Sequence, residues 1–139
     1  MITRASVMLA ILLALGLGGA HASSTPRFLG CRAYTGSHAP GAVKPRSIIA
    51  ACADGNFWFG ALRWSSWSAA GAHALGTAHV NDCKPYCAAG HFHTYPVTVS
   101  LAVAKSCDGK IELTRLAWRF TRAKPRSQPR SGSESFRCA

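Results

Sequence analysis

The sequence predicts an all-β protein, a small antiparallel β-sandwich or barrel of about five to seven strands held together by disulfides. Three observations predict it. Short segments with alternating apolar and polar residues recur along the chain, Asp-Gly pairs separate some of them, and no long amphipathic helical pattern interrupts them. The six cysteines are an even number, which suits a disulfide framework.

The clearest strand covers residues 95–104, where Val97, Val99, Leu101 and Val103 alternate with Thr98, Ser100 and Ala102. This period of two, with many β-branched residues, is typical of a half-buried strand. A second strand is predicted over residues 111–121. There the apolar positions change parity between Leu113 and Leu116, which predicts a β-bulge.

Other segments with strand character lie earlier in the chain, at 46–53, 56–64 and 72–80, with a weaker one at 27–34. Asp54-Gly55 and Asp108-Gly109 fall between these segments. Asp-Gly is a preferred pair in tight hairpin turns, so we expect a turn at each place.

The N-terminus has the composition of an export signal. Arg4 precedes an apolar run over residues 5–20, and Ala20-His21-Ala22 fits a small-x-small cleavage site. We therefore predict a signal peptide over residues 1–22 and a secreted protein of the extracellular space or cell envelope. An uncleaved membrane anchor is the alternative, but the run is short for a span and contains three glycines.

Cleavage after Ala22 leaves 117 of the 139 residues, a size typical of a single domain. We assign residues 23–121 to one β-rich domain and residues 122–139 to an extended basic tail rich in Pro, Ser and Arg. Cys138 would then either attach the tail to the domain or be available to a second chain, so the oligomeric state stays open.

All six cysteines lie in the mature part of the chain, which predicts three disulfides in an oxidising compartment. The candidates are Cys31, Cys52, Cys83, Cys87, Cys107 and Cys138. The spacing does not choose among the pairings, although Cys83 with Cys87 can close a small turn around Pro85, and Cys107 with Cys138 would tie down the tail.

A run of potential metal ligands lies in the middle of the chain. His79, Cys83, Cys87 and His91 are spaced by four, and His93 follows. That spacing gathers side chains only on a helix, which Pro85 and Gly90 oppose, so the two cysteines are expected to be oxidised. On a strand His91 and His93 would share a face, which leaves His79, His91 and His93 as candidate metal ligands and two surface histidines as the alternative. No cofactor is predicted.

Three segments within residues 44–101 carry a resemblance. They are Ala51-Cys52-Ala53-Asp54-Gly55, Leu62-Arg63-Trp64-Ser65-Ser66-Trp67 and Cys83-Lys84-Pro85-Tyr86-Cys87-Ala88-Ala89-Gly90. Together they resemble a family of small exported bacterial proteins of unknown function. The resemblance covers less than half of the chain and implies a shared exported fold, with no activity to assign to any residue.

Carboxylates for acid–base chemistry are few. Of five in the chain, Asp54 and Asp108 are expected in turns, Glu112 is expected to point outward, and Glu134 lies in the tail, which leaves Asp82. The chain has no Gly-x-Ser-x-Gly elbow, no His-Glu-x-x-His motif and no phosphate-binding glycine loop. We therefore expect a binding protein, although a dispersed triad of Asp82, His91 and a serine stays open.

The charge indicates the class of partner. Loss of Arg4 with the signal peptide lowers Lys plus Arg from 16 to 15 against 5 Asp plus Glu, a net charge of +10. Such a charge favours association with an anionic polymer or surface: an envelope polymer, acidic lipid or nucleic acid, the last without sequence specificity. The candidate anion-binding residues are those of the tail: Arg122, Lys124, Arg126, Arg130 and Arg137.

Trp64 and Trp67 are candidate surface aromatic residues. They are an odd number of positions apart, so on a regular strand they would face opposite sides, with one in the core and the other exposed near a turn. The alternative function is a metal-binding or hydrolytic protein that uses the region of His79, Asp82, His91 and His93.

Overall fold

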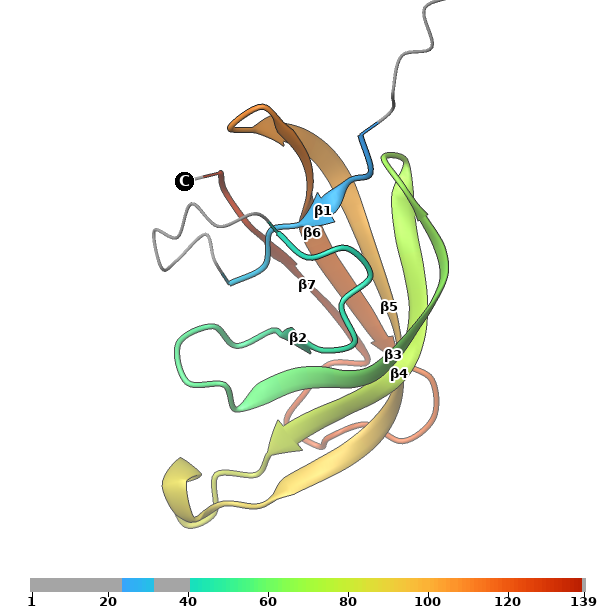
Figure 1. Cartoon of the computed structure of the whole chain (residues 1–139). Helices are drawn as coiled ribbons and strands as arrows, with labels where there is room; N and C mark the ends of the chain where they lie inside the picture. Colours follow the sequence, from blue (N-terminus) through green and yellow to red (C-terminus); the bar gives the residue numbers. More distant parts are fainter. Residues whose placement is uncertain (1–23, 32–40, 139) are drawn as a thin grey trace, which may run out of the picture.

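The computed structural model describes residues 24–31 and 41–138, and Figure 1 shows their arrangement. The predicted signal peptide and residues 32–34 of the weakest predicted strand lie outside these ranges. The strands are β1 (Arg27–Phe28), β2 (Ile48–Ile49), β3 (Phe57–Ser68), β4 (Gly71–Asn81), β5 (Phe92–Cys107), β6 (Lys110–Phe120) and β7 (Ser131–Ser135). One 3₁₀ turn, η1 (Cys87–Ala89), is the only helical element among the described residues, so the all-β prediction is confirmed.

All seven strands belong to one sheet. Six of them follow the order β1-β6-β5-β4-β3-β2, and β7 pairs with β6 beside β1. The long strands β3 to β6 form an antiparallel meander, whereas β1 is parallel to β6. The sheet curls into an open half-barrel (Figure 1). No helix in the described part of the chain is long and apolar enough to cross a membrane.

The two N-terminal segments, residues 24–31 and 41–49, cover the inner, concave side of the sheet (Figure 1). Phe28 and Ala42 form an isolated bridge between them, and β2 pairs with β3. The predicted strand over 46–53 is reduced to Ile48–Ile49. Beyond it, Ala50 and Ala51 both donate to the carbonyl of Phe57, which turns the chain toward the expected loop at Asp54-Gly55.

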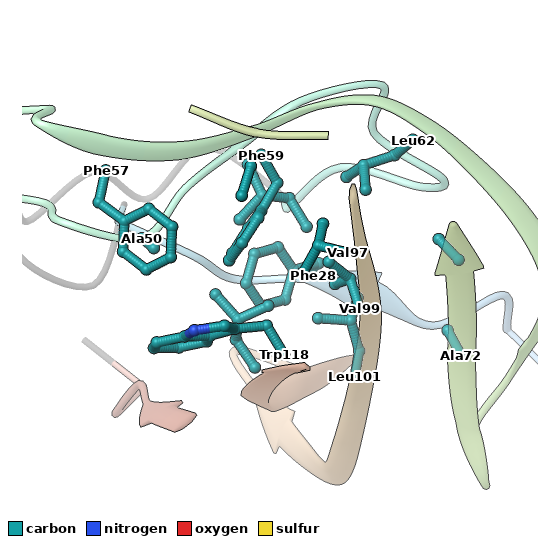
Figure 2. Close-up of a cluster of buried hydrophobic side chains, with 14 of the residues drawn as sticks. Phe28, Ala50, Phe57, Phe59, Leu62, Ala72, Val97, Val99, Leu101 and Trp118 are labelled. Carbon is teal, nitrogen blue, oxygen red and sulfur yellow. The ribbon is translucent and has the colours of Figure 1, made fainter. Parts of the chain in front are cut away.

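The core fills the concavity of the sheet (Figure 2). Val97, Val99 and Leu101 of β5 are each 1% exposed, as their alternation predicts, whereas the prediction is wrong for Val103, which is 47% exposed where the backbone turns to a positive φ. Phe57 lies edge to face with both Phe59 and Trp118, at centroid distances of 5.0 and 5.2 Å. Burial of one such side chain contributes about 1.5–3 kcal/mol, and the aromatic edge contacts add to that.

Two bulges lie in β3. Its pairing with β4 shifts register between Gly60 and Arg63, and again between Trp64 and Ser66. Ala61, in the first bulge, has a φ of 51°. Each extra residue reverses the parity of the strand, so Trp64 and Trp67 lie on the same, inner side. The prediction that they face opposite sides is therefore wrong.

The predicted bulge in β6 is also wrong. The pairing of β6 with β5 keeps one register from Val97↔Phe120 to Cys107↔Lys110. The irregularity lies on β5 instead, at Val103, whose φ is 58° and whose carbonyl accepts the Thr114 hydroxyl at 2.8 Å. Glu112, Leu113 and Thr114 are all buried, so the apolar pattern changes parity in a part of β6 that is covered on both faces.

Glu112 is buried, at 3% exposure, rather than pointing outward as predicted. The amide of Gly41 donates to its Oε1 at 3.3 Å. Gly41 passes so close that a Cβ at this position would touch both the Phe28 carbonyl and Glu112 Oε2. The long-range contact with residue 41 thus overrides the local alternation of β6.

The three disulfides join Cys31 to Cys52, Cys83 to Cys87 and Cys107 to Cys138, and the described residues include no free cysteine. Asp108 and Gly109 both have positive φ, of 48° and 73°, as a two-residue type I′ hairpin turn requires. The prediction of a stapled β-domain with a tight turn here is confirmed.

The C-terminal segment differs from the extended tail that we predicted. Residues 131–135 form β7, which pairs with β6 from Arg119↔Ser131 to Arg115↔Ser135. Phe136 is only 3% exposed and lies edge to face with Phe28 at 5.5 Å. The C-terminal segment is therefore part of the sheet and its core, and residue 121 does not mark the end of the domain.

Candidate functional site

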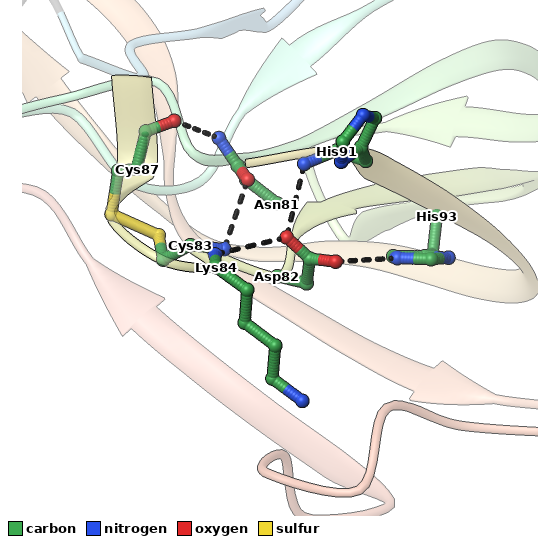
Figure 3. A network of polar contacts seen from close by, with 7 residues as sticks. All are labelled: Asn81, Asp82, Cys83, Lys84, Cys87, His91 and His93. Carbon is green, nitrogen blue, oxygen red and sulfur yellow. Dashed lines mark hydrogen bonds and ion pairs between the residues drawn. A yellow bond between two sulfur atoms is a disulfide. The ribbon is translucent and has the colours of Figure 1, made fainter. Parts of the chain in front are cut away.

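Asp82, at the end of β4, is the centre of a polar network (Figure 3). Its Oδ1 accepts the amides of Lys84 and His91 at 3.1 and 3.0 Å. Its Oδ2 is 3.0 Å from Nε2 of His93, which is half exposed. These contacts lower the pKa of Asp82 well below its ordinary value, and the His91 amide contributes most, followed by the His93 side chain and the Lys84 amide. The carboxylate is therefore ionised at neutral pH.

The loop beside Asp82 is held by side chain to backbone contacts. Asn81 donates through Nδ2 to the Cys87 carbonyl at 2.8 Å and accepts the Cys83 amide at 3.0 Å. Gly90 lies against the same groups, since a Cβ there would contact Asn81 Oδ1 and lie 2.8 Å from the Cys83 nitrogen. With the Cys83–Cys87 disulfide, these contacts fix the loop that bears Lys84.

The candidate metal ligands are not brought together. His79 pairs across the strands with Trp58, and their rings stack at 3.7 Å with an angle of 2°. His79 precedes the inward-facing Val80, which is paired with His93, so His79 and His93 lie on opposite faces of the sheet. The described residues contain no group of three His, Cys, Asp or Glu side chains suited to a metal ion. In Figure 3 the His91 imidazole points away from Asp82.

His93 lines a cleft of about 450 Å³ between the 83–87 loop and the segment that precedes β7. Its polar side chains come from both walls: Asn81, Asp82, Lys84, His93, Tyr95, Arg126 and Ser127. The cleft brings together residues more than thirty positions apart in the sequence, such as Lys84 and Arg126. Sequence reasoning about a dispersed triad named Asp82 and His91, whereas the side-chain partner of Asp82 is His93.

The opposite, convex side of the sheet carries arginines that sequence analysis did not select. We call it the outer face, and its residues fall in three rows across the strands. The first row is Arg63, Leu75, Thr98, Arg119 and Ser131; the second is Ser66, His73, Ser100, Ala117 and Ser133; the third is Ala102, Arg115 and Ser135. None of these residues is an Asp or a Glu.

Small side chains in the middle row leave a shallow hollow in the outer face. Its volume is about 350 Å³, and its lining includes His73, Thr98, Ser100, Ala117 and Arg119. Arg115 and Arg119 are four residues apart on β6, which corresponds to about 13 Å along a strand. Arg63 lies three strand spacings from Arg119, or about 14 Å. The hollow is thus lined by hydroxyl-bearing residues and by one arginine, Arg119.

Among the described residues, no lysine or arginine side chain forms an ion pair with a carboxylate. The one ion pair between described residues joins the His93 imidazole to Asp82. Asp54 accepts the Asn56 amide in its turn at 3.0 Å, and Glu112 is buried. The positive charge of the described surface is therefore not neutralised locally.

The five tail residues selected from the sequence divide into two groups. Lys124 donates to the carbonyls of Pro125 and Gln128, and Arg130 donates to those of Phe120 and Arg122. These two side chains therefore stabilise the segment that leads into β7. Arg122, Arg126 and Arg137 are exposed and keep their guanidinium groups available.

The two candidate surface tryptophans are half buried rather than displayed. Trp64 donates through its indole nitrogen to the Pro45 carbonyl and Trp67 to the Pro26 carbonyl, both at 2.8 Å. They fasten the N-terminal segments to β3.

The alternation of Leu116, Trp118 and Phe120 as inward-facing residues could have predicted that Arg115 and Arg119 point outward. The outward position of Arg63 depends on a bulge that the sequence does not reveal.

Comparison with known proteins adds no relative to this arrangement. No protein-family model, no curated protein and no solved structure matches the chain. The resemblance to a family of small exported bacterial proteins stays a prediction.

Proposed function

We propose that this protein is an exported binding domain that holds an anionic polymer against the outer face of its sheet. The observation that carries the proposal is the placement of Arg63, Arg115 and Arg119 on one face without a carboxylate among its rows. Guanidinium groups are suited to phosphate, sulfate and carboxylate, with which they form bidentate hydrogen bonds.

The shape of the face favours a chain over a small molecule. The hollow is shallow, and Arg119, which lines it, lies about 13 Å from Arg115 along the strand and about 14 Å from Arg63 across the strands. One small anion cannot contact all three, but successive charges of an extended polymer can. Thr98, Ser100 and the serines of β7 supply hydroxyls between them, which suit the polar groups of a sugar or phosphodiester backbone.

The proposed export of the protein rests on the composition of its N-terminus and on its disulfides. Three disulfides are compatible with an oxidising compartment outside the cytosol, and the predicted signal peptide supports the same location. A basic domain in that location would meet anionic envelope polymers, acidic lipid and released nucleic acid. We propose the polymer as its ligand because the charges extend along the sheet.

The test compares two variants of equal charge. Arg63 and Arg119 are changed to Gln in one, and the tail residues Arg122 and Arg137 in the other. Binding to fluorescent dextran sulfate and to single-stranded DNA is measured by anisotropy from about 50 to 200 mM salt. We expect the outer-face variant to lose at least about tenfold in affinity with a flatter salt slope, because fewer counterions are released.

The tail variant should retain most of the affinity. Equal losses in the two variants would show that only the net charge matters. Absence of binding at low salt, or binding that does not respond to salt, would contradict the proposal. Far-ultraviolet circular dichroism of both variants verifies that the β-fold is retained.

A further inference from the structure

The cleft beside Asp82 has the properties of a second, separate binding site. Four of the side chains that line it are able to donate hydrogen bonds into it: Lys84, Tyr95, Arg126 and Ser127. Lys84 and Arg126 have no carboxylate partner among the described residues. The site lies where β4 ends and β5 begins, and none of its residues belongs to the outer-face rows.

The acceptors in the cleft are already occupied. The Asp82 carboxylate accepts two backbone amides and faces the His93 imidazole. The Asn81 amide group contacts Asn56, Cys83 and Cys87. A ligand that offered hydrogen-bond donors would therefore find few free acceptors, whereas one that offers negatively charged oxygens would meet unpaired donors.

The contact with Asp82 fixes which nitrogen of His93 remains available. Because the ionised Asp82 carboxylate can only accept, Nε2 of His93 must donate to it. The second ring nitrogen, Nδ1, is then directed elsewhere and donates an N–H when the ring is protonated. Asp82 both fixes the ring and balances its charge. With Lys84 and Arg126, the protonated cleft has a net charge of +2, since Asp82 offsets one of the three positive groups.

Both walls of the cleft are braced before any ligand arrives. The loop of Lys84 is closed by the Cys83–Cys87 disulfide. On the other wall, the Gln128 amide donates to the Pro125 carbonyl at 3.2 Å, so that Arg126 and Ser127 are the central residues of a turn. Lys124 spans the same turn by donating to the carbonyls of Pro125 and Gln128. Preorganised walls lower the entropic cost of binding.

We propose that this cleft binds one small tetrahedral oxyanion, a phosphate or sulfate group, between Lys84, His93 and Arg126. Three donors that reach the cleft from a loop, a strand and a turn match the several oxygens of such a group better than the two oxygens of one carboxylate. The ligand is either a free anion or the terminal group of a larger molecule. The outer face has no part in the site.

Sulfate is the probe for the test, because its charge is constant between about pH 5 and pH 8, where histidine titrates. Binding is measured by calorimetry at pH 6 and by the displacement of the His93 ring signals in NMR spectra. The main variant combines Lys84→Gln with Arg126→Gln. Its control combines Arg115→Gln with Arg119→Gln, which removes the same charge from the outer face. We expect a loss of at least tenfold in the first and less than twofold in the second.

Asp82→Asn separates a positioned site from a diffuse positive charge. If charge alone attracted sulfate, removal of the negative Asp82 would strengthen binding. On our proposal binding weakens severalfold, because His93 loses the partner that orients its ring. Tighter binding by Asp82→Asn, or equal losses in the two double variants, would overturn the proposal.

Phosphate and a short phosphomonoester then distinguish a free anion from a terminal group. Equal affinity for both assigns the free anion, and tighter binding of the ester assigns the terminal group. The outcome is independent of the polymer experiment. Dextran sulfate binding can fail while sulfate still displaces the His93 signals, and dextran sulfate can bind while sulfate leaves these signals unchanged. The two results are distinguishable because the outer-face variant and the cleft variant have no substituted residue in common.

Discussion

The indole rings of Trp64 and Trp67 meet edge to face on the inner side of β3, with centroids 4.7 Å apart and an interplanar angle of 89°. The bulge between Trp64 and Ser66 brings them together, because it turns an odd spacing into a shared face. Each ring then holds one N-terminal segment through its N–H group. This pair is where the curled sheet is fastened to the segments that cover its concave side.

Removal of either indole N–H should destabilise the domain. Trp64→Phe and Trp67→Phe leave the Pro45 and Pro26 carbonyls without their donors, which should cost about 1–2 kcal/mol each. Urea denaturation with intact disulfides measures the loss. Trp58→Phe is the matched control, since the Trp58 indole donates to no group in the described residues and its stacked position can be kept by a phenyl ring. Equal losses in all three variants would contradict a role of the N–H groups.

Ala61→Gly should stabilise the protein. Ala61 is exposed and has a φ of 51° in the first bulge of β3, a conformation that costs an L-residue about 1–2 kcal/mol. Glycine removes this cost. Its greater conformational freedom in the unfolded chain offsets part of the benefit, so the free energy of unfolding should rise by about 0.5–1 kcal/mol. Ala117→Gly, in a regular part of β6, should destabilise by a similar amount. The shift of the urea midpoint has opposite sign in the two variants if the bulge is as described.

The three disulfides should differ in their contribution to stability. They close loops with sequence separations of 31, 21 and 4 residues. The chain-entropy relation gives about 3.7 kcal/mol for Cys107–Cys138, about 3.3 for Cys31–Cys52 and about 1.9 for Cys83–Cys87. Paired Cys→Ser variants test this order in urea. If removal of Cys83–Cys87 proves the most destabilising, the predicted order is wrong, and this disulfide stabilises the whole fold and not only the loop beside Asp82.

Asp82 should make the fold sensitive to acid. Its pKa is lowered in the folded state by the His91 amide, the His93 side chain and the Lys84 amide. The stabilisation is therefore present above the ordinary aspartate pKa of about 3.9 and is lost as the pH falls below it. Asp82→Asn keeps an acceptor for the backbone but does not titrate, so its urea midpoint should change less between about pH 5 and pH 2. Parallel pH profiles of the two proteins would refute this assignment.

His79 should titrate below the ordinary histidine range. Burial lowers its pKa from 6.5, because its ring lies flat on that of Trp58 and part of its hydration is lost. The unfolded chain then binds more protons, so this contribution to stability is present above about pH 6.5 and falls as the pH decreases toward the folded pKa. NMR titration of the His79 ring measures the midpoint. Trp58→Ala exposes the ring and should return the midpoint toward 6.5, whereas an unchanged midpoint would exclude the stack as the cause.

The sequence by itself determined the local features of this protein. The alternation of Val97, Val99 and Leu101 predicted their burial in β5, since the pleat of a strand directs every second side chain to the same face; it failed only at Val103, where a positive φ interrupts the pleat. Asp108-Gly109 predicted its hairpin turn because both residues tolerate positive φ. The even number of cysteines predicted the disulfides. Each of these depends on the chemistry of neighbouring residues and on no distant contact.

The tertiary structure decided where that local pattern is broken. Ala61 has no turn chemistry that would announce a bulge, yet its bulge directs Arg63 outward, and the second bulge, between Trp64 and Ser66, aligns Trp64 with Trp67. Burial of Glu112 required Gly41 to pass over β6, a contact across 71 residues. The segment read as a tail became β7 because β6 had a free edge beside β1. Register shifts, covered faces and unpaired strand edges depend on which distant segments meet, and the alternation of residues along one strand contains no information about its neighbours.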